Sequence, residues 1–401
     1  MTGTIVVVGA GLAGLRTAEK LRTAGWTGAV RVIGAEDHLP YNRPPLTKEA
    51  LRDGLGHEHV ELRRRGSVGD VEWLLGREAV RVDLAGRTVH LRDGSEMTYD
   101  GLVVATGVEA RRLDLGPARR HVVRTVDDAV GLHAALTAAS RVVVVGAGFI
   151  GCEVACTARL LGCEVTVVDP MSSPLELQLG PLAGTEVGRR HRAAGIRFRL
   201  GRVVAGIEES AGGSAVTLDD GTILGADVVV EAVGSVPRVG LLEGHGLDLS
   251  DGILCDADLH PVADGMPVPE VVAVGDVARV PQWLLGGEAR RIEHWSTAVD
   301  TAGHAARSLL ATLTGTEVGA AYAPVPSFWS DQADLKIQSF GVPSAGLADV
   351  RVLDGDLAGS VALGYHRDGR LVGVVLLDLT AEQMRFRSLL VDSAQVPVTS
   401  A

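Results

Sequence analysis

The chain has 401 residues, which at roughly 100–200 residues per domain predicts two or three domains. Hydrophobic residues make up 46% of the sequence and charged residues 22%, which is ordinary for a soluble globular protein. The formal net charge of −12 argues against a nucleic acid or an anionic membrane as a partner, because both bind basic surfaces.

The N-terminal Met1 leads directly into an apolar stretch, so we expect no signal peptide. No apolar run approaches the roughly 18 residues that a membrane-spanning helix needs. No CxxC pair occurs, and we therefore expect a cytoplasmic protein with reduced thiols. The four cysteines are Cys152, Cys156, Cys163 and Cys255.

The first predicted unit is a strand, a glycine-rich turn, a helix and a second strand. Residues 4–8 are apolar and β-branched, the helical pattern from Leu15 ends at Gly25, and residues 30–33 form the next strand. In a GxGxxG turn the first glycine bends the chain, the second admits a pyrophosphate, and the third lets the helix pack on the strand. The candidate dinucleotide-binding residues are Gly9, Gly11, Leu12, Ala13 and Gly14.

The same arrangement recurs in the middle of the chain. Residues 141–145 predict a strand, 153–161 a helix that ends at Gly162, and 164–168 the following strand. A single GxGxxG is weak evidence, but two copies that each follow a strand and precede a helix favour two dinucleotide sites. The candidate residues of the second turn are Gly146, Gly148, Phe149, Ile150 and Gly151.

An acidic residue after the second strand of such a unit accepts hydrogen bonds from a ribose. In the first unit Glu36 is the candidate, although it could equally be a solvated carboxylate in a loop. In the second unit Asp169 ends the strand, and a carboxylate there would repel a 2′-phosphate. We therefore expect NADH to be preferred over NADPH.

The remaining elements follow in chain order. A helix is predicted over residues 298–313, and Pro324 and Pro326 mark a boundary after it. Residues 327–378 read as strands and turns, followed by a short terminal helix. Three further strands, each running into a glycine turn, are predicted at residues 102–107, 227–234 and 271–276.

Residues 39–48 closely resemble the PYxRPPLSK segment of the FAD-dependent ferredoxin reductases that serve bacterial cytochrome P450 and Rieske oxygenase systems. Thr47 replaces the usual serine. The prolines, Pro45 among them, stiffen a loop that would lie beside the flavin ring. Arg43 could meet a phosphate, and Lys48 could place a cation where flavin reduction builds negative charge.

The resemblance covers nearly the whole chain and implies further cofactor contacts. The segment Arg291-Ile292-Glu293-His294-Trp295 is similar to the family's RxExW, and residues 327–332 are similar to its FWSDQ region. Asp276 would accept a hydrogen bond from a hydroxyl of the ribityl chain, or would cap a helix. His294 is expected to be a packed or exposed histidine rather than a catalyst. The implied residues are Ala79, Thr106, Gly107, Arg124, Gly234, Gly275, Asp276, Glu293, His294, Trp295 and Trp329.

The fold class implied is α/β, with two Rossmann-like dinucleotide-binding domains in a glutathione-reductase-like arrangement and a C-terminal α+β interface domain. Residues 1–109 and 234–320 would form the FAD domain and 110–233 the NADH domain. Residues 321–401 would form the C-terminal domain.

The function implied is transfer of a hydride from NADH to FAD, followed by single electrons to a [2Fe–2S] ferredoxin. Lys48 would offset the developing charge, and Glu153 would orient the nicotinamide amide or lie on the helix surface. Arg63, Trp329 and Lys336 are the docking candidates, although Trp329 could be a core residue. The family often carries an arginine in the loop after Asp169, and here residues 172–178 offer none.

Three other functions are compatible with parts of this pattern. A disulfide reductase needs a redox cysteine pair beside the flavin, and Cys152 and Cys156 stand four apart on a predicted helix, where a bond is geometrically poor. An NADH oxidase or nitrite-reductase-like flavoenzyme would share the fold but deliver electrons to a small molecule. A flavoprotein that signals rather than turns over would be reduced by NADH over minutes.

Overall fold

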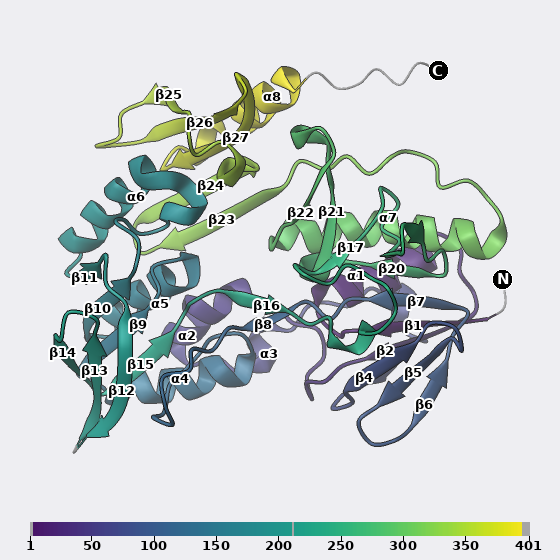
Figure 1. Ribbon diagram of the computed structural model, residues 1–401, viewed down its shortest axis with the longest axis horizontal. Helices are drawn as coiled ribbons and strands as arrows, with labels where there is room; N and C mark the ends of the chain where they lie inside the picture. Colours follow the sequence, from purple (N-terminus) through teal and green to yellow (C-terminus); the bar gives the residue numbers. More distant parts are fainter. Residues whose placement is uncertain (1–2, 211, 395–401) are drawn as a thin grey trace. The chain divides into compact units, whose positions relative to one another are not determined.

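The computed structural model describes residues 3–210 and 212–394. Its contacts divide the chain into two units. The first comprises residues 1–42, 61–109 and 236–326, and the second comprises residues 43–60, 110–235 and 327–401. The chain leaves the first unit in β8 (Val108–Ala110) and returns to it in β16 (Ser235–Pro237) (Figure 1).

The first unit is built on a parallel sheet with the strand order β20-β7-β1-β2-β3. Apolar β-branched residues dominate these strands, as expected for a sheet buried on both faces. The four strands predicted in this sheet are confirmed, with the bounds β1 Thr4–Val8, β2 Ala29–Ile33, β7 Gly101–Val104 and β20 Val271–Ala273. The fifth strand, β3 Glu72–Leu74, was not predicted.

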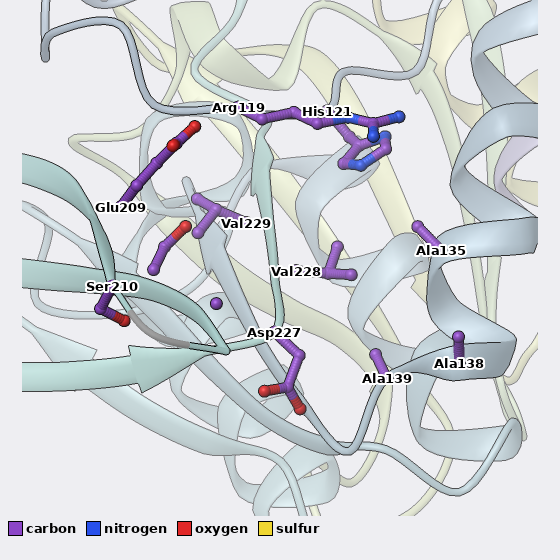
Figure 2. Close-up of a pocket in the computed structure, with 12 residues that line it drawn as sticks. Arg119, His121, Ala135, Ala138, Ala139, Glu209, Ser210, Asp227, Val228 and Val229 are labelled. Carbon is purple, nitrogen blue, oxygen red and sulfur yellow. The ribbon is translucent and has the colours of Figure 1, made fainter.

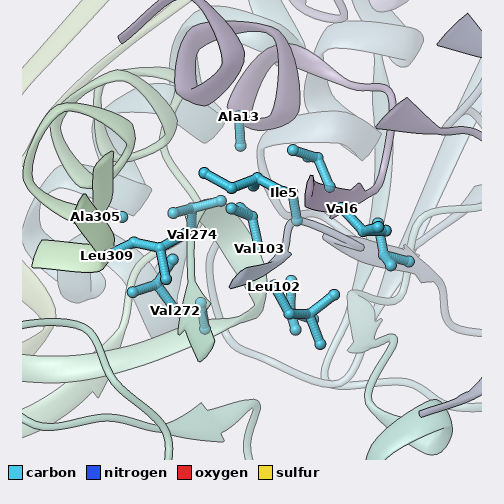
Figure 3. Packing of buried hydrophobic residues seen from close by; sticks show 14 of the residues in the cluster. Ile5, Val6, Ala13, Leu102, Val103, Val272, Val274, Ala305 and Leu309 are labelled. Atoms are coloured by element: carbon cyan, nitrogen blue, oxygen red, sulfur yellow. The ribbon is translucent and has the colours of Figure 1, made fainter. Parts of the chain in front are cut away.

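Two helices, α1 (Leu12–Thr23) and α7 (Trp295–Thr314), pack against each other beside this sheet. Figure 3 shows where the core forms, with Ile5 and Val103 of the strands close to Leu309 of α7. The prediction started α7 at residue 298, three residues too late. His294 is extended and serves as the N-cap, so the weak helix formers after it form the first turn.

Smaller sheets complete the first unit. One is an antiparallel meander in the order β4-β5-β6, and another has the order β17-β21-β22. A short 3-10 turn, η4 (Gly275–Val277), follows β20 directly. The remaining strands are β4 Ala79–Asp83, β5 Thr88–Leu91, β6 Glu96–Thr98, β17 Ile253–Leu254, β18 Val262–Ala263, β19 Met266–Pro267, β21 Ala278–Gln282 and β22 Glu288–Arg291.

The second unit contains a parallel sheet with the order β11-β10-β9-β15 and a meander, β12-β13-β14. Helix α5 (Phe149–Leu160) follows β9 and begins four residues before its predicted start at 153, because Gly148 is its N-cap. The strands are β9 Arg141–Val145, β10 Glu164–Asp169, β11 Arg197–Leu200, β12 Val204–Ser210, β13 Gly213–Leu218, β14 Ile223–Ala226 and β15 Val228–Glu231.

Apart from α5 and the terminal helix, the helices of the second unit were not predicted from the sequence. The longest, α6, is broken at Gly180, which has a φ of 77° and is followed by Pro181. Proline lacks the N–H that a continuous helix would need there. The bounds are η1 Pro44–Thr47, α2 Glu49–Asp53, α3 His57–Val60, α4 Val126–Ala138 and α6 Glu176–Ala193.

The C-terminal part of the second unit is an antiparallel sheet in the order β23-β24-β27-β26-β25 with one helix against it. The predicted succession of strands and a terminal helix is confirmed. The elements are β23 Ser327–Gln332, β24 Leu335–Gly341, β25 Val350–Gly355, β26 Val361–Arg367, β27 Arg370–Leu377 and α8 Gln383–Ser393.

The division into FAD, NADH and C-terminal domains stays a prediction. The contact-based units differ from it in placing residues 43–60 and 327–401 with residues 110–235, and in extending the first unit to residue 326. Among the described residues, no helix has both the length and the apolar character needed to cross a membrane.

Candidate functional site

The first glycine-rich turn leaves space at one position and none at the other two. A Cβ on Gly9, whose φ is 121°, would lie 2.1 Å from the carbonyl oxygen of Ala105. A Cβ on Gly14 would lie 2.0 Å from the carbonyl oxygen of Gly9. A Cβ on Gly11 would meet nothing within 4 Å. The open side of Gly11, at the N-cap of α1, is where a pyrophosphate could approach the backbone.

The second turn repeats this geometry. A Cβ on Gly146 would lie 2.3 Å from the carbonyl oxygen of Ala232, and one on Gly151 would lie 2.0 Å from that of Gly146. At Gly148, the N-cap of α5, the nearest atom would be Nε2 of Gln178 at 3.8 Å. Both turns therefore have the shape that an adenine dinucleotide requires.

The two acidic candidates have different surroundings. Asp169 accepts hydrogen bonds from the backbone N–H groups of Ala147 (2.6 Å) and Met171 (2.8 Å), so it fixes the second glycine-rich turn to the end of β10. Glu36 accepts a hydrogen bond from the hydroxyl of Tyr41 at 2.5 Å. Neither side chain is a fully solvated loop carboxylate.

The FAD candidates of the first unit gather around the ends of β7 and β20. Thr106 donates to the carbonyl oxygen of Arg238 at 2.7 Å. The N–H of Gly275 donates to the hydroxyl of Thr301 on α7 at 2.9 Å, which fixes the turn that carries Asp276. The parallel strands β1, β7 and β20 place these turns and Gly9 at one edge of the sheet.

The segment that leads into α7, up to its first residue Trp295, also belongs to the first unit. Trp295 donates its indole N–H to the amide oxygen of Asn42 at 3.0 Å. Arg291 donates to Glu293 at 2.5 Å. Burial lowers the pKa of His294 to about 4, so this histidine is neutral at pH 7. Ala79 begins β4.

In the second unit, the loop at residues 44–48 meets α5 through an ion pair. The Nζ of Lys48 lies 2.7 Å from Oε2 of Glu153, and the hydroxyl of Thr47 donates to the same oxygen at 2.5 Å. Glu153 is 5% exposed, which excludes the alternative prediction that it lies on the helix surface. The structure thus brings together the two residues predicted to be catalytic.

Three further residues complete this cluster, and sequence reasoning gave none of them a role in it, although Ser330 and Gln332 lie in the segment similar to FWSDQ. The hydroxyl of Ser330 on β23 donates to Oε1 of Glu153 at 2.5 Å. Gln332 donates to Ser330 at 3.0 Å. Thr157 donates to the carbonyl oxygen of Thr47 at 2.7 Å. Thr157 was detectable, because it stands four residues after Glu153 on the same helix face.

Arg43 and Arg124 also lie together in the second unit. The guanidinium of Arg43 donates to the carbonyl oxygen of Arg124. Thr125 and Asp128 form a capping box at the start of α4, which fixes the backbone of this segment. Arg43 therefore has a protein partner in addition to any phosphate.

The docking candidates are distributed over both units. Trp329 is 44% exposed on β23, which excludes the alternative of a core tryptophan. Lys336 is exposed on the neighbouring strand β24, opposite Asp331. Arg63 is exposed in the first unit.

The cysteines do not form a redox pair. All four are free and buried. Burial raises the pKa of the Cys152 thiol well above its usual value and that of Cys156 to about 12. The thiol of Cys152 donates to the carbonyl oxygen of Ala147, and Cys156 faces His191. A disulfide reductase mechanism, which needs a reactive thiolate, has no support here.

Figure 2 shows a pocket of about 320 Å³ in the second unit, lined by residues that include Arg119, His121 and Val228. It lies at the beginning of β15, where Val228 pairs with Val142. Dinucleotides bind outside the carboxyl ends of parallel strands. This pocket is therefore separate from the second glycine-rich turn, which follows the other end of β9.

Comparison with known proteins agrees with a chain that carries two dinucleotide-binding turns. The family model "Pyridine nucleotide-disulphide oxidoreductase" matches residues 3–302, and the model "Reductase C-terminal" matches residues 327–401. The ferredoxin–NAD(+) reductase component of the anthranilate 1,2-dioxygenase system of Burkholderia cepacia is 37% identical, over 93% of this chain and 90% of that protein.

Two other proteins extend the likeness over almost the whole chain. Rhodocoxin reductase of Rhodococcus erythropolis is 35% identical, over 99% of this chain and 91% of that protein. The solved covalent complex of putidaredoxin reductase and putidaredoxin has a chain that is 30% identical, with a TM-score of 0.88 over 98% of this chain and 93% of that chain. The chain belongs to the FAD- and NAD(H)-binding pyridine nucleotide-disulphide oxidoreductase family, among the ferredoxin reductases of oxygenase systems.

Proposed function

We propose that this chain takes electrons from NADH and passes them singly to a [2Fe–2S] ferredoxin that serves an oxygenase. The observation that carries the proposal is the pair of glycine-rich turns with the same geometry, in a chain that also has the reductase C-terminal domain. Two dinucleotides can bind to such a chain, one as resident cofactor and one as substrate. When bound, FAD supplies a two-electron acceptor that can also release single electrons.

We assign the FAD site to the first unit. The open face of Gly11 would receive the pyrophosphate, and Asp276 would accept a hydrogen bond from the ribityl chain. Six residues of the second unit are retained as ones that would contact FAD, namely Lys48, Arg43, Pro45, Arg124, Gly234 and Trp329. The other residues assigned to FAD, all in the first unit, are Gly9, Leu12, Ala13, Gly14, Glu36, Ala79, Thr106, Gly107, Gly275, Glu293, His294 and Trp295.

We assign the NADH site to the second unit. Gly148 would admit the pyrophosphate of NADH at the N-terminus of α5. Asp169 would accept hydrogen bonds from the adenine ribose while it holds the turn in place. Glu153 would accept a hydrogen bond from the nicotinamide amide. The positively charged ammonium of Lys48 lies next to this carboxylate. Gly146, Phe149, Ile150 and Gly151 complete the site.

The ferredoxin would dock on exposed residues that include Trp329, Lys336 and Arg63. Lys336 and Arg63 are cations on a chain whose net charge is −12, so they would provide local attraction for an acidic partner. Trp329 offers a large aromatic contact, which is typical of residues that dominate binding energy.

A comparison of electron acceptors tests this function. NADH consumption is measured with oxygen alone and with a [2Fe–2S] ferredoxin added, after an anaerobic NADH titration that follows flavin absorbance. We expect rapid flavin reduction and strong stimulation by the ferredoxin. Equal rates with oxygen alone would favour the alternative, an NADH oxidase or nitrite-reductase-like enzyme. Reduction over minutes would favour a signalling flavoprotein.

We also propose that the protein acts in the cytoplasm. Its four cysteines are free thiols in the structure, which is usual for a protein of a reducing compartment. Fractionation of the source cells, with flavin-linked NADH oxidation as the readout, would test this location.

A further inference from the structure

The C-terminal sheet reaches the candidate NADH site through one strand, β23, which runs beside α5 within the second unit (Figure 1). The side chains of this strand alternate sharply. Trp329 and Asp331 are exposed, whereas Ser330 and Gln332 are each 1% exposed. Two buried polar side chains on one face of this strand need partners, because an unsatisfied buried polar group is costly.

Ser330 finds its partner in Glu153. Its hydroxyl lies 2.5 Å from Oε1 of the carboxylate. The direction of this bond follows from the carboxylate, which has no proton to donate when it is ionised. Gln332 donates its amide N–H to the hydroxyl oxygen of Ser330, which leaves the hydroxyl proton free for Glu153. The hydroxyl proton of Ser330 is therefore the one that points at Glu153.

The carboxylate of Glu153 thus has donors on both oxygens. Thr47 and Lys48 approach Oε2, and Ser330 approaches Oε1. An ionised carboxylate has about four lone-pair sites. Three are engaged by these donors, which leaves about one for a ligand and fixes the plane of the group.

We propose that Ser330 is a positioning residue for NADH, which acts by fixing the carboxylate plane of Glu153 so that its remaining lone pair meets the nicotinamide amide. Gln332 supports it by orienting the hydroxyl of Ser330. The inference rests on the proposed role of Glu153. It assigns to the C-terminal domain a part in binding the nicotinamide.

The test is stopped-flow reduction of the holoenzyme by NADH over a range of NADH concentrations, which separates the dissociation constant from the limiting rate. We expect Ser330→Ala to change one or both by about five- to tenfold at unchanged FAD content, while Ser330→Cys, which keeps a weak donor, changes them less. The matched control is Ser339→Ala on β24. Ser339 is equally buried but has no bond to Glu153, so its variant should reduce at the wild-type rate.

A double-mutant cycle with Glu153→Gln distinguishes the two ways of failing. If Ser330 acts through the carboxylate of Glu153, Ser330→Ala has a smaller effect in the Glu153→Gln background, where no carboxylate is left to be fixed. Wild-type reduction by Glu153→Gln would overturn the proposed role of Glu153 itself. Two other outcomes would overturn the positioning role of Ser330 alone, provided that Glu153→Gln is reduced slowly. One is a wild-type rate of flavin reduction in Ser330→Ala, and the other is fully additive effects of the two substitutions.

Discussion

The ammonium of Lys48 lies 2.7 Å from Oε2 of Glu153, and the two side chains are 16% and 6% exposed. Both charged groups are largely shielded from water, so each is stabilised mainly by the other. The pair joins the loop at residues 44–48 to helix α5, both in the second unit.

Replacement of Lys48 by methionine should slow the reduction of flavin by NADH by on the order of ten- to a hundredfold, because the fixed positive charge is lost. It should also destabilise the protein, by less than the roughly 3–5 kcal/mol typical of a fully buried pair that is broken. Stopped-flow absorbance measures the rate and thermal unfolding the stability.

The control is the double variant Lys48→Met/Glu153→Gln. Its neutral amide can still accept a hydrogen bond at its single oxygen and donate its N–H to the other hydroxyl, so thermal stability should recover while reduction stays slow. An unchanged rate in Lys48→Met would rule out the electrostatic role.

Substitutions at the two open glycines, Gly11 and Gly148, should each impair the binding of a different dinucleotide. Gly11→Ala should fold, since its φ is −86° and the new Cβ meets no protein atom, at a cost of up to about 1 kcal/mol for alanine at an N-cap. It should lose FAD, as measured by the ratio of flavin to protein absorbance.

The matched variant Gly148→Ala should keep its FAD and raise the KM for NADH. Gly14→Ala serves as the opposite control, because its Cβ would collide with the carbonyl oxygen of Gly9 and so disturb folding itself. Normal FAD content in Gly11→Ala would contradict the assigned pyrophosphate position.

Asp169 should decide the choice between NADH and NADPH. We expect Asp169→Asn to narrow the ratio of kcat/KM for NADH over NADPH by about tenfold, or about 1.4 kcal/mol, because repulsion of the 2′-phosphate is removed. Steady-state kinetics with both nucleotides measure the ratio. Damage to the turn alone would lower both values together and leave their ratio unchanged.

His191 should make stability depend on pH. Burial lowers its pKa to about 4, so between pH 6.5 and 4 the unfolded chain binds a proton that the folded chain does not. Stability is fully present above pH 6.5 and falls by about 3 kcal/mol as the pH drops to 4. Thermal unfolding at several pH values measures this loss.

His191→Phe should weaken the pH dependence, since the ring can still stack on Phe198 but cannot titrate. Part of the dependence should remain, because His294 also has a lowered pKa. Replacement of the exposed His59 by glutamine is the control and should leave the profile unchanged. The same profile in His191→Phe and wild type would refute the assignment.

The sequence by itself determined the two nucleotide-binding units. A strand, a glycine at three fixed positions and a helix form a local pattern. The first and third glycines are required by the close approach of the backbone in their own turn, and the second leaves space for a phosphate. The starts of α5 and α7 were predicted too late because capping depends on backbone conformation at Gly148 and His294. Resemblance to a family added Lys48, and Glu153 was chosen for its place just inside the second predicted helix; the structure brings the two into contact.

Only the tertiary structure decided what surrounds Glu153. Ser330 stands 177 residues further along the chain, and no periodicity or spacing links a serine on a C-terminal strand to a glutamate on α5. Their contact depends on how β23 pairs with its sheet and packs beside the helix. The environment of Asp169 was likewise invisible in the sequence, because its partners are backbone N–H groups whose directions follow from the folded loop.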